Sequence, residues 1–168
     1  RYADYLTSLQ RLAADEEKRT AGDPVFAPLA RLYRERLDFT SYLFNEKYDR
    51  RLVEGFKELL QSGHVELLTS AATHGYLPLL GIQKEAIYAQ VAAGIENFER
   101  IFGTPPRGIW LPECAYTPDL EDILSELGLC YFFTATHGVL YAAPRPKYGV
   151  YSPVLTPGGL AAFGRDPE

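Results

Sequence analysis

The first third of the chain carries apolar residues at intervals of three and four, which is the spacing of one face of an α-helix. Residues 2–19 show this spacing without interruption, and residues 29–63 show it with interruptions. Asp23 followed by Pro24 is typical of a helix start, because the side chain caps free backbone amides and proline has no amide hydrogen to leave unpaired. We therefore predict one helix over the first region and two or three helices in the second, with a break near Asn45–Asp49.

From the helix that ends at Gly63 onward, a helical segment, a glycine and a short apolar segment follow one another three times. The glycines are Gly63, Gly103 and Gly128, and glycine after a helix adopts the left-handed C-terminal cap at low cost. The apolar segments lack strict alternation, as expected of strands that are covered on both faces. The pattern predicts an α/β protein with a parallel sheet. Its strands are expected in residues 64–70, 107–113 and 129–135, with further short strands in 148–155 and 158–164.

Composition places the chain among ordinary soluble globular proteins, with 46% hydrophobic and 23% charged residues in a length of 168, enough for one domain. A net charge of -5 without a basic block argues against nucleic acid or an anionic membrane as a partner. No apolar run reaches the roughly 20 residues of a membrane helix. The two cysteines make a weak case for a disulfide, which favours a cytoplasmic location.

The ends of the chain and its rarer residues suggest its origin. The chain begins at Arg1, contains no Met and ends directly after a strand-like segment, so we expect it to be a segment of a longer protein. The absence of Met and the presence of twelve Pro favour a heat-tolerant source.

Three candidate site residues follow the three predicted strands at nearly the same distance. His74 lies 11 residues after Gly63, Glu113 lies 10 after Gly103, and His137 lies 9 after Gly128. In parallel α/β proteins, ligands bind at the carboxyl ends of the strands. The matched positions therefore predict a polar cleft at that edge of the sheet.

Each of these residues also has an ordinary structural interpretation. A single His at a strand end is more often a hydrogen-bonded scaffold residue than a ligand, and Glu113 could be solvated or paired with the nearby Arg107. A metal site is possible from His, Glu and Cys114, but the chain lacks the usual ligand spacings. Cys114 is also a possible nucleophile, although a Cys after an apolar strand is more often a small hydrophobic residue.

Carboxylate chemistry at Glu113, beside aromatic residues that can hold sugar rings, is the remaining interpretation. Retaining glycoside chemistry requires a second carboxylate about 5 Å from the first. The chain offers only Asp119, Glu121 and Asp166 as candidates for it, and none lies in a recognisable motif.

Two motifs resemble conserved regions of glycoside hydrolase family 57, and most closely of its α-1,4-glucan branching enzymes. The segment ATHGYLPLL (residues 72–80) is similar to the family's second region, and GIWLPECAY (residues 108–116) is similar to its third. The resemblance implies that Glu113 is the catalytic nucleophile and that His74 contributes to sugar binding. It also implies an incomplete (β/α)7 TIM-like barrel with additional helices, which works without a metal or other cofactor.

By the same resemblance, residues 1–168 form part of the catalytic barrel domain, lacking its first strand and its C-terminal portion. The family's acid/base Asp is then expected outside this chain, and the segment alone is expected to be inactive. The implied substrate is an α-1,4-glucan such as amylose or a glycogen-like chain. Glucan contacts are expected from Trp110, Tyr116, Tyr76 and His137, together with His74.

Three alternatives remain open. Within the family, the activity could be that of an α-amylase or a 4-α-glucanotransferase. The segment could also be a non-catalytic glucan-binding or assembly module. A metal-dependent polysaccharide deacetylase on a related barrel is the third alternative.

Overall fold

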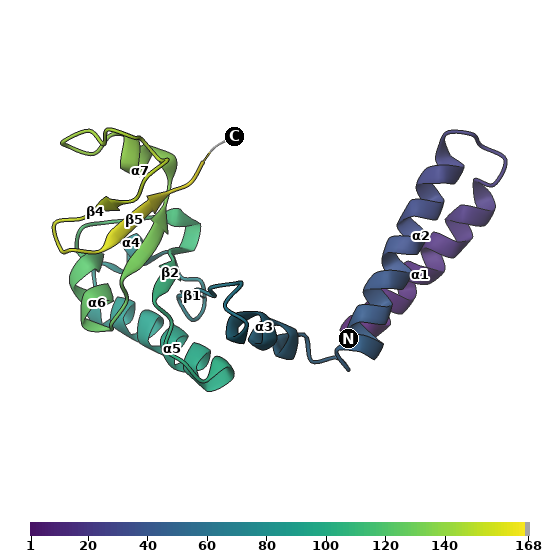
Figure 1. Cartoon of the computed structure of the whole chain (residues 1–168), viewed down its shortest axis with the longest axis horizontal. Helices are drawn as coiled ribbons and strands as arrows, with labels where there is room; N and C mark the ends of the chain where they lie inside the picture. The colour runs from purple at the N-terminus through teal and green to yellow at the C-terminus, as the bar shows by residue number, and fades with distance from the viewer. Residues whose placement is uncertain (167–168) are drawn as a thin grey trace. The chain divides into compact units, whose positions relative to one another are not determined.

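The computed structural model of the chain describes residues 1–166. The chain divides into two compact units, Arg1–His64 and Val65–Glu168. The first unit is entirely helical, and the second contains the sheet together with the helices that pack against it (Figure 1).

The first unit contains a hairpin of two long helices, α1 (Tyr2–Arg19) and α2 (Phe26–Tyr42). Leu6 and Ala13 of α1 are buried. The carboxylate of Asp23 accepts hydrogen bonds from the backbone amides of Val25 and Phe26, at 2.8 and 2.9 Å. These bonds lower the pKa of Asp23. Asp23 therefore stabilises the start of the second helix as predicted, although the regular helix begins two residues after Pro24.

The predicted interruption of the helical region is confirmed. A short π-helix (η1, Leu43–Lys47) continues from α2, and helix α3 begins only at Leu52 and ends at Gln61. Between them, Asp49 and Arg50 adopt positive φ values of 46° and 60°. A left-handed backbone at two consecutive residues cannot continue a right-handed helix, so the chain changes direction here.

The second unit is built on a five-stranded sheet in the order β1-β2-β3-β5-β4. Neighbouring strands from β1 to β5 run parallel, and β4 pairs antiparallel with β5 at the far edge. The predicted α/β class with a parallel sheet and additional helices is confirmed. The strands are β1 (Thr69–Ser70), β2 (Gly108–Trp110), β3 (Tyr131–Thr134), β4 (Val154–Leu155) and β5 (Ala161–Gly164).

Helices of the second unit cover one face of this sheet (Figure 1). Ile109, Phe132 and Ala162 point from three adjacent strands into a continuous apolar core, which α5 and α6 complete. The helices are α4 (Leu77–Leu80), α5 (Lys84–Phe102), η2 (Pro112–Cys114, a 3-10 turn), α6 (Leu120–Glu126) and α7 (Thr136–Leu140).

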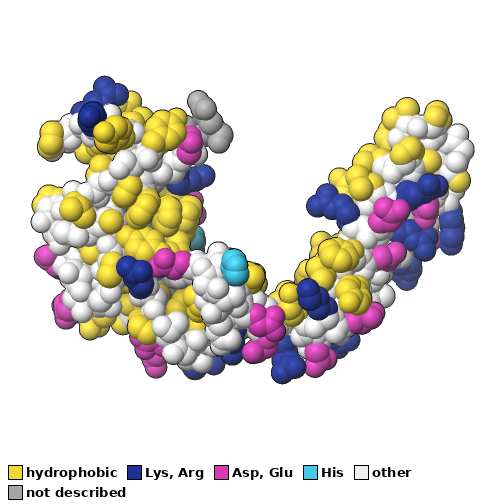
Figure 2. Space-filling model, in the orientation of Figure 1, with side chains coloured by type: hydrophobic (Ala, Val, Ile, Leu, Met, Phe, Trp, Pro, Cys, Tyr) yellow, Lys and Arg dark blue, Asp and Glu magenta, His cyan; other side chains and the backbone are white. Residues whose placement is uncertain are grey.

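The opposite face of the sheet carries a row of stacked aromatic rings. The ring centroids of Trp110 and Phe133 are 5.7 Å apart, and those of Phe133 and Phe163 are 5.3 Å apart. All three side chains are half-buried. Hydrophobic side chains are also plainly visible on the surface of this unit in Figure 2. Because side chains alternate along a strand, these rings lie on the face opposite Ile109 and Phe132.

All five predicted strands are shorter than expected, most clearly the first and the fourth. Of residues 64–70, only Thr69–Ser70 pair with a neighbour, and of residues 148–155, only Val154–Leu155 do. Pro153 lies directly before β4, and proline cannot donate to a strand ladder. The predicted role of the glycines holds, since Gly63, Gly103 and Gly128 have φ values of 73°, 73° and 80°.

Candidate active site

Glu113 lies on a tight turn that follows β2 at the carboxyl edge of the sheet. Strand β2 ends at Trp110, and Pro112–Cys114 then form the 3-10 turn η2. Hydrogen bonds close the turn from Cys114 N to Leu111 O (2.8 Å) and from Ala115 N to Pro112 O (3.1 Å). Leu111, Pro112 and Cys114 are buried, so they anchor the turn, while the Glu113 side chain is 74% exposed.

The backbone of this turn is left-handed at two consecutive residues. Glu113 has a φ of 55° and Cys114 a φ of 54°. For residues other than glycine this conformation costs about 1–2 kcal/mol each, so it persists only where the surrounding structure enforces it. Backbone outliers of this kind are concentrated at functional sites, and this one sets the direction of the Glu113 side chain.

The structure brings His74 and Glu113 together as the matched strand positions predicted. His74 Nε2 lies 3.7 Å from Glu113 Oε1, and the His74 side chain is 53% exposed. Among the described residues, the basic side chain within 4 Å of the Glu113 carboxylate is therefore that of His74 rather than that of Arg107. His74 lies just beyond β1 and also has a left-handed φ of 56°, in a turn closed by its own amide bonding to Ala71 O at 2.9 Å.

Arg165, which the sequence analysis did not single out, lies beside this turn. Its guanidinium carbon is 5.9 Å from the centre of the Trp110 ring, and its Nη1 is 3.9 Å from Cys114 Sγ. A guanidinium within about 6 Å of an indole face is attracted by the ring's quadrupole. Arg165 directly follows β5, and this strand-end position was the signal that could have identified it.

His137 follows β3, but on the short helix α7 rather than in an extended strand end. It lines a small hollow of about 230 Å³ with Ala135, Thr136, Arg165 and Asp166. The tetrapeptide Ala-Thr-His-Gly occurs twice in the sequence, at residues 72–75 and 135–138. The two copies differ in conformation, because His74 is left-handed and His137 is helical. Arg165 contributes to this hollow and also contacts Trp110.

Tyr116 lies on the helix-covered face of the sheet rather than on the face of Trp110. Its ring stacks on Phe132 with centroids 5.1 Å apart and planes at 10°. Its hydroxyl donates to the carboxylate of Glu121. Burial and this hydrogen bond both raise the pKa of Tyr116. Tyr76, the other predicted tyrosine contact, is 44% exposed and precedes α4.

Glu121 is a buried carboxylate with a structural environment. It is 6% exposed, and its Oε2 accepts a hydrogen bond of 2.7 Å from the backbone amide of Gly158. Burial raises its pKa, but hydrogen bonds from Tyr116, Thr156 and Gly158 outweigh that effect and lower it overall. Of the other candidates for a second carboxylate, Asp119 immediately precedes α6, and Asp166 lines the hollow beside His137.

Several other features bear on the alternatives. Within residues 1–166, no three His, Cys, Asp or Glu side chains lie together in a way that could hold a metal ion. Cys114 is buried, Cys130 is exposed, and both are free thiols. None of the helices in this part of the chain is long and apolar enough to cross a membrane.

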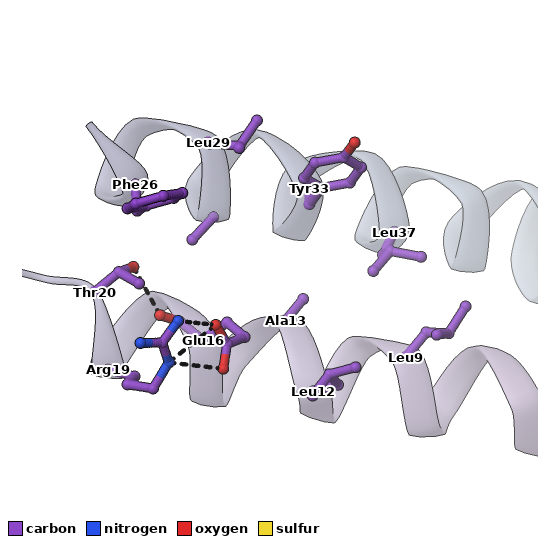
Figure 3. A pocket seen from close by; sticks show the side chains of 11 residues that line it. Leu9, Leu12, Ala13, Glu16, Arg19, Thr20, Phe26, Leu29, Tyr33 and Leu37 are labelled. Atoms are coloured by element: carbon purple, nitrogen blue, oxygen red, sulfur yellow. Dashed lines mark hydrogen bonds and ion pairs between the residues drawn. The ribbon is translucent and has the colours of Figure 1, made fainter. Parts of the chain in front are cut away.

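A second hollow lies in the helical unit, between α1 and α2 (Figure 3). Its volume is about 330 Å³, and apolar side chains of both helices line it, including Leu9, Ala13, Phe26 and Tyr33. Among the described residues, the only side chains in its lining that are charged at neutral pH are Glu16 and Arg19, which are hydrogen-bonded to each other. The described lining of this hollow lacks a carboxylate and an imidazole that face each other, as Glu113 and His74 do at the edge of the sheet.

The fold and the site define an α/β protein whose carboxylate and imidazole groups meet at the carboxyl ends of parallel strands. The chain belongs to glycosyl hydrolase family 57, because the model of this family matches residues 1–168. It is therefore a member of a family of carbohydrate-active enzymes.

Three relatives illustrate this membership. A 1,4-alpha-glucan branching enzyme of Thermococcus kodakarensis is 44% identical over 119 residues, which are 62% of this chain and 17% of that protein. The structure of a GH57-type branching enzyme from Pyrococcus horikoshii is 33% identical, with a TM-score of 0.86 over 99% of this chain and 33% of that one. The structure of the alpha-amylase AmyC from Thermotoga maritima is 38% identical, with a TM-score of 0.85 over 99% of this chain and 32% of that one.

The chain thus spans at most about a third of the length of these relatives. The match of nearly the whole chain to two family structures confirms the prediction that its sheet and helices are part of the family's α/β barrel fold. That residues 1–168 form one catalytic domain without its first strand stays a prediction.

Proposed function

We propose that this chain carries the nucleophile of an enzyme that acts on α-1,4-glucans with retention of configuration, and that the nucleophile is Glu113. The observation that carries the proposal is the turn after β2, where a left-handed backbone directs an exposed carboxylate to 3.7 Å from His74. A nucleophilic carboxylate must be ionised and reachable by the anomeric carbon of the sugar. Exposure at the edge of the sheet makes the Glu113 carboxylate reachable. His74, which carries positive charge when protonated, favours the ionised form of that carboxylate.

In the proposed reaction, Glu113 attacks the anomeric carbon and forms a covalent glycosyl-enzyme. His74 donates a hydrogen bond to a sugar hydroxyl, and His137 does so from the neighbouring strand end; these bonds strengthen as positive charge develops on the sugar. A carboxylic acid must protonate the leaving oxygen. We assign that role to an Asp outside this chain, since Glu121 is buried and already accepts hydrogen bonds from Tyr116 and Gly158.

Aromatic rings are proposed to hold the glucan across the strand ends. Trp110 presents a half-buried ring beside Arg165, and Tyr76 is exposed next to the turn of His74. Sugar rings pack their apolar faces on such side chains. Tyr116 remains a proposed contact as well, but its hydroxyl is engaged by Glu121, so only part of its ring is available.

The specific activity we propose is that of a 1,4-α-glucan branching enzyme. The 6-hydroxyl of an acceptor chain would resolve the glycosyl-enzyme and form an α-1,6 branch. The identity of 44% to a branching enzyme supports this choice over hydrolysis. We place the reaction in the cytoplasm, where glycogen-like chains are stored, and the two free thiols agree with a reducing compartment.

A hydrolytic α-amylase is the second candidate, because AmyC matches this chain with 38% identity and almost the same TM-score as the branching enzyme. A 4-α-glucanotransferase differs from both in forming new α-1,4 bonds. The deciding experiment incubates amylose with a protein of the relatives' length that carries this chain. Debranching followed by chain-length analysis detects α-1,6 branches, while release of reducing ends detects hydrolysis.

A further inference from the structure

Two side-chain hydroxyls hold the ends of the turn that carries Glu113. Ser70 Oγ donates to Trp110 O at 2.9 Å, and Thr134 Oγ1 donates to Cys114 O at 3.1 Å. Ser70 ends β1 and Thr134 ends β3, and these are the two strands that flank β2 in the sheet. The Trp110 carbonyl, before the turn, is therefore hydrogen-bonded to β1, and the Cys114 carbonyl, at the end of the turn, is hydrogen-bonded to β3.

The bond from Thr134 lies in a dry environment. Thr134 is 4% exposed, and the Cys114 carbonyl also accepts a hydrogen bond of 3.2 Å from the amide of Ala135. Two donors from the end of β3 therefore converge on the carbonyl of a residue whose φ is 54°. Since a left-handed backbone at a non-glycine residue relaxes unless its surroundings oppose the change, bonds at this carbonyl help to maintain the turn.

Ser70 also orients His74. Its Oγ, which donates to Trp110 O, also lies 3.4 Å from His74 Nδ1. With Nδ1 against Ser70, the ring presents its Nε2 to Glu113 Oε1 at 3.7 Å. The same serine thus fixes one end of the turn and the ring that faces the nucleophile.

We infer that Ser70 and Thr134 are positioning residues that hold Glu113 in its attacking orientation from the two neighbouring strands. This inference rests on the proposed function, in which Glu113 is the nucleophile. Neither residue is assigned contact with the substrate; both act through the backbone of residues 110–114, and Ser70 also through His74. Misplacement of a reacting group by about 1 Å can reduce a rate by about 100-fold, so small relaxations of this turn are expected to matter.

The test measures formation of the covalent glycosyl-enzyme directly. The probe is a 5-fluoro α-maltooligosyl fluoride, in which a carboxylate oxygen bonds to the anomeric carbon as fluoride leaves, so the step depends little on an acid catalyst. The protein is one of the relatives' length that carries this chain, and mass spectrometry of its peptides locates the label. The variants are Ser70→Ala, Thr134→Val and Thr134→Ser. The matched control is Thr69→Val, because the buried Thr69 hydroxyl makes the same kind of bond, 2.9 Å to Gly94 O on helix α5.

We expect Ser70→Ala and Thr134→Val each to lower the labelling rate constant of Glu113 about 10-fold at an unchanged half-saturating probe concentration. Thr134→Ser, which keeps the hydroxyl, should restore the rate to within about 2-fold of wild type, and Thr69→Val should label at the wild-type rate. Labelling of Glu113 at the wild-type rate in both Ser70→Ala and Thr134→Val overturns the positioning role alone, as does an equal loss in Thr69→Val. A wild-type protein that carries no label on Glu113 overturns the proposed function, and the positioning role with it.

Discussion

His74 and Glu113 face each other from two neighbouring strand ends, with Nε2 and Oε1 3.7 Å apart, and both residues have left-handed φ values, of 56° and 55°. The pair depends on the parallel pairing of β1 with β2, which aligns Ser70 with Trp110 and brings the residues that follow them to the same edge. Because both side chains are more than half exposed, their mutual attraction contributes little to folding. The stability of the pair therefore does not account for its geometry.

Replacing Glu113 by Gln is the first test of this site. We expect branch formation to fall by at least about 1,000-fold, because an amide cannot serve as the nucleophile. The fold should be intact, since the side chain is 74% exposed. The measurement is α-1,6 branch formation on amylose by a protein of the relatives' length, with Glu126→Gln, an exposed glutamate at the end of α6, as the control. Retained branching in Glu113→Gln alongside an active control would refute the assignment.

The isolated 168-residue chain provides a second test. In the proposed reaction an acid from outside this chain protonates the leaving oxygen, so the purified chain should form no branches and release no reducing ends from amylose. Maltooligosaccharide binding, measured by calorimetry on the same sample, shows whether glucan is bound without turnover. Turnover by the isolated chain would mean that its own carboxylates complete the active site.

The His74→Asn variant tests the residue that faces the proposed nucleophile. Asparagine tolerates a left-handed backbone well, so the turn should be preserved while the imidazole is lost. We expect kcat to fall by about 100-fold, which is typical for loss of one group that stabilises transition-state charge. His64→Asn is the matched control, because His64 is exposed and contacts Ser62 in the helical unit. Equal kcat values for the two variants would show that His74 has no part in the chemical step.

The sequence predicts part of this site well, for a physical reason. Counting from the capping glycines places His74 and Glu113 at one height, and parallel strands then bring them to one edge. Left-handed φ values at Glu113 and Cys114 leave no such periodic signal, because they arise from contacts with neighbouring strands. The turn of Pro112–Cys114 also interrupts the strand alternation, so the sequence could not show that Tyr116 turns towards Phe132 and away from the face of Trp110.

Helix α5 packs against β1 so closely that only glycine fits at the contact. A Cβ added at Gly94 would lie 2.1 Å from Ser70 O, whereas one added at Gly103 would meet nothing within 4 Å. Gly103→Ala therefore isolates the cost of its φ of 73°, about 1–2 kcal/mol. Gly94→Ala should cost more, about 3 kcal/mol, because the added Cβ overlaps backbone atoms. Urea unfolding monitored by the fluorescence of Trp110, the single tryptophan, reports on the sheet unit. Similar midpoints for the two variants would contradict the close packing.

The buried carboxylate of Glu121 predicts a pH dependence of stability. Burial raises its pKa, but the hydrogen bonds from Tyr116, Thr156 and Gly158 together lower it by more than burial raises it. The pKa in the folded protein therefore lies below the ordinary value of 4.5. A lowered folded pKa stabilises the protein above pH 4.5, and this contribution disappears as the pH falls through the folded pKa. We expect Glu121→Gln to lower the free energy of unfolding by about 1–2 kcal/mol at pH 7. The difference from wild type should shrink as the pH falls from about 5 to about 3, because the wild-type carboxylate becomes protonated in this range. Urea unfolding at several pH values, with Glu126→Gln as control, measures it. A difference that stays constant over this range would show that the carboxylate bonds do not favour its charged form.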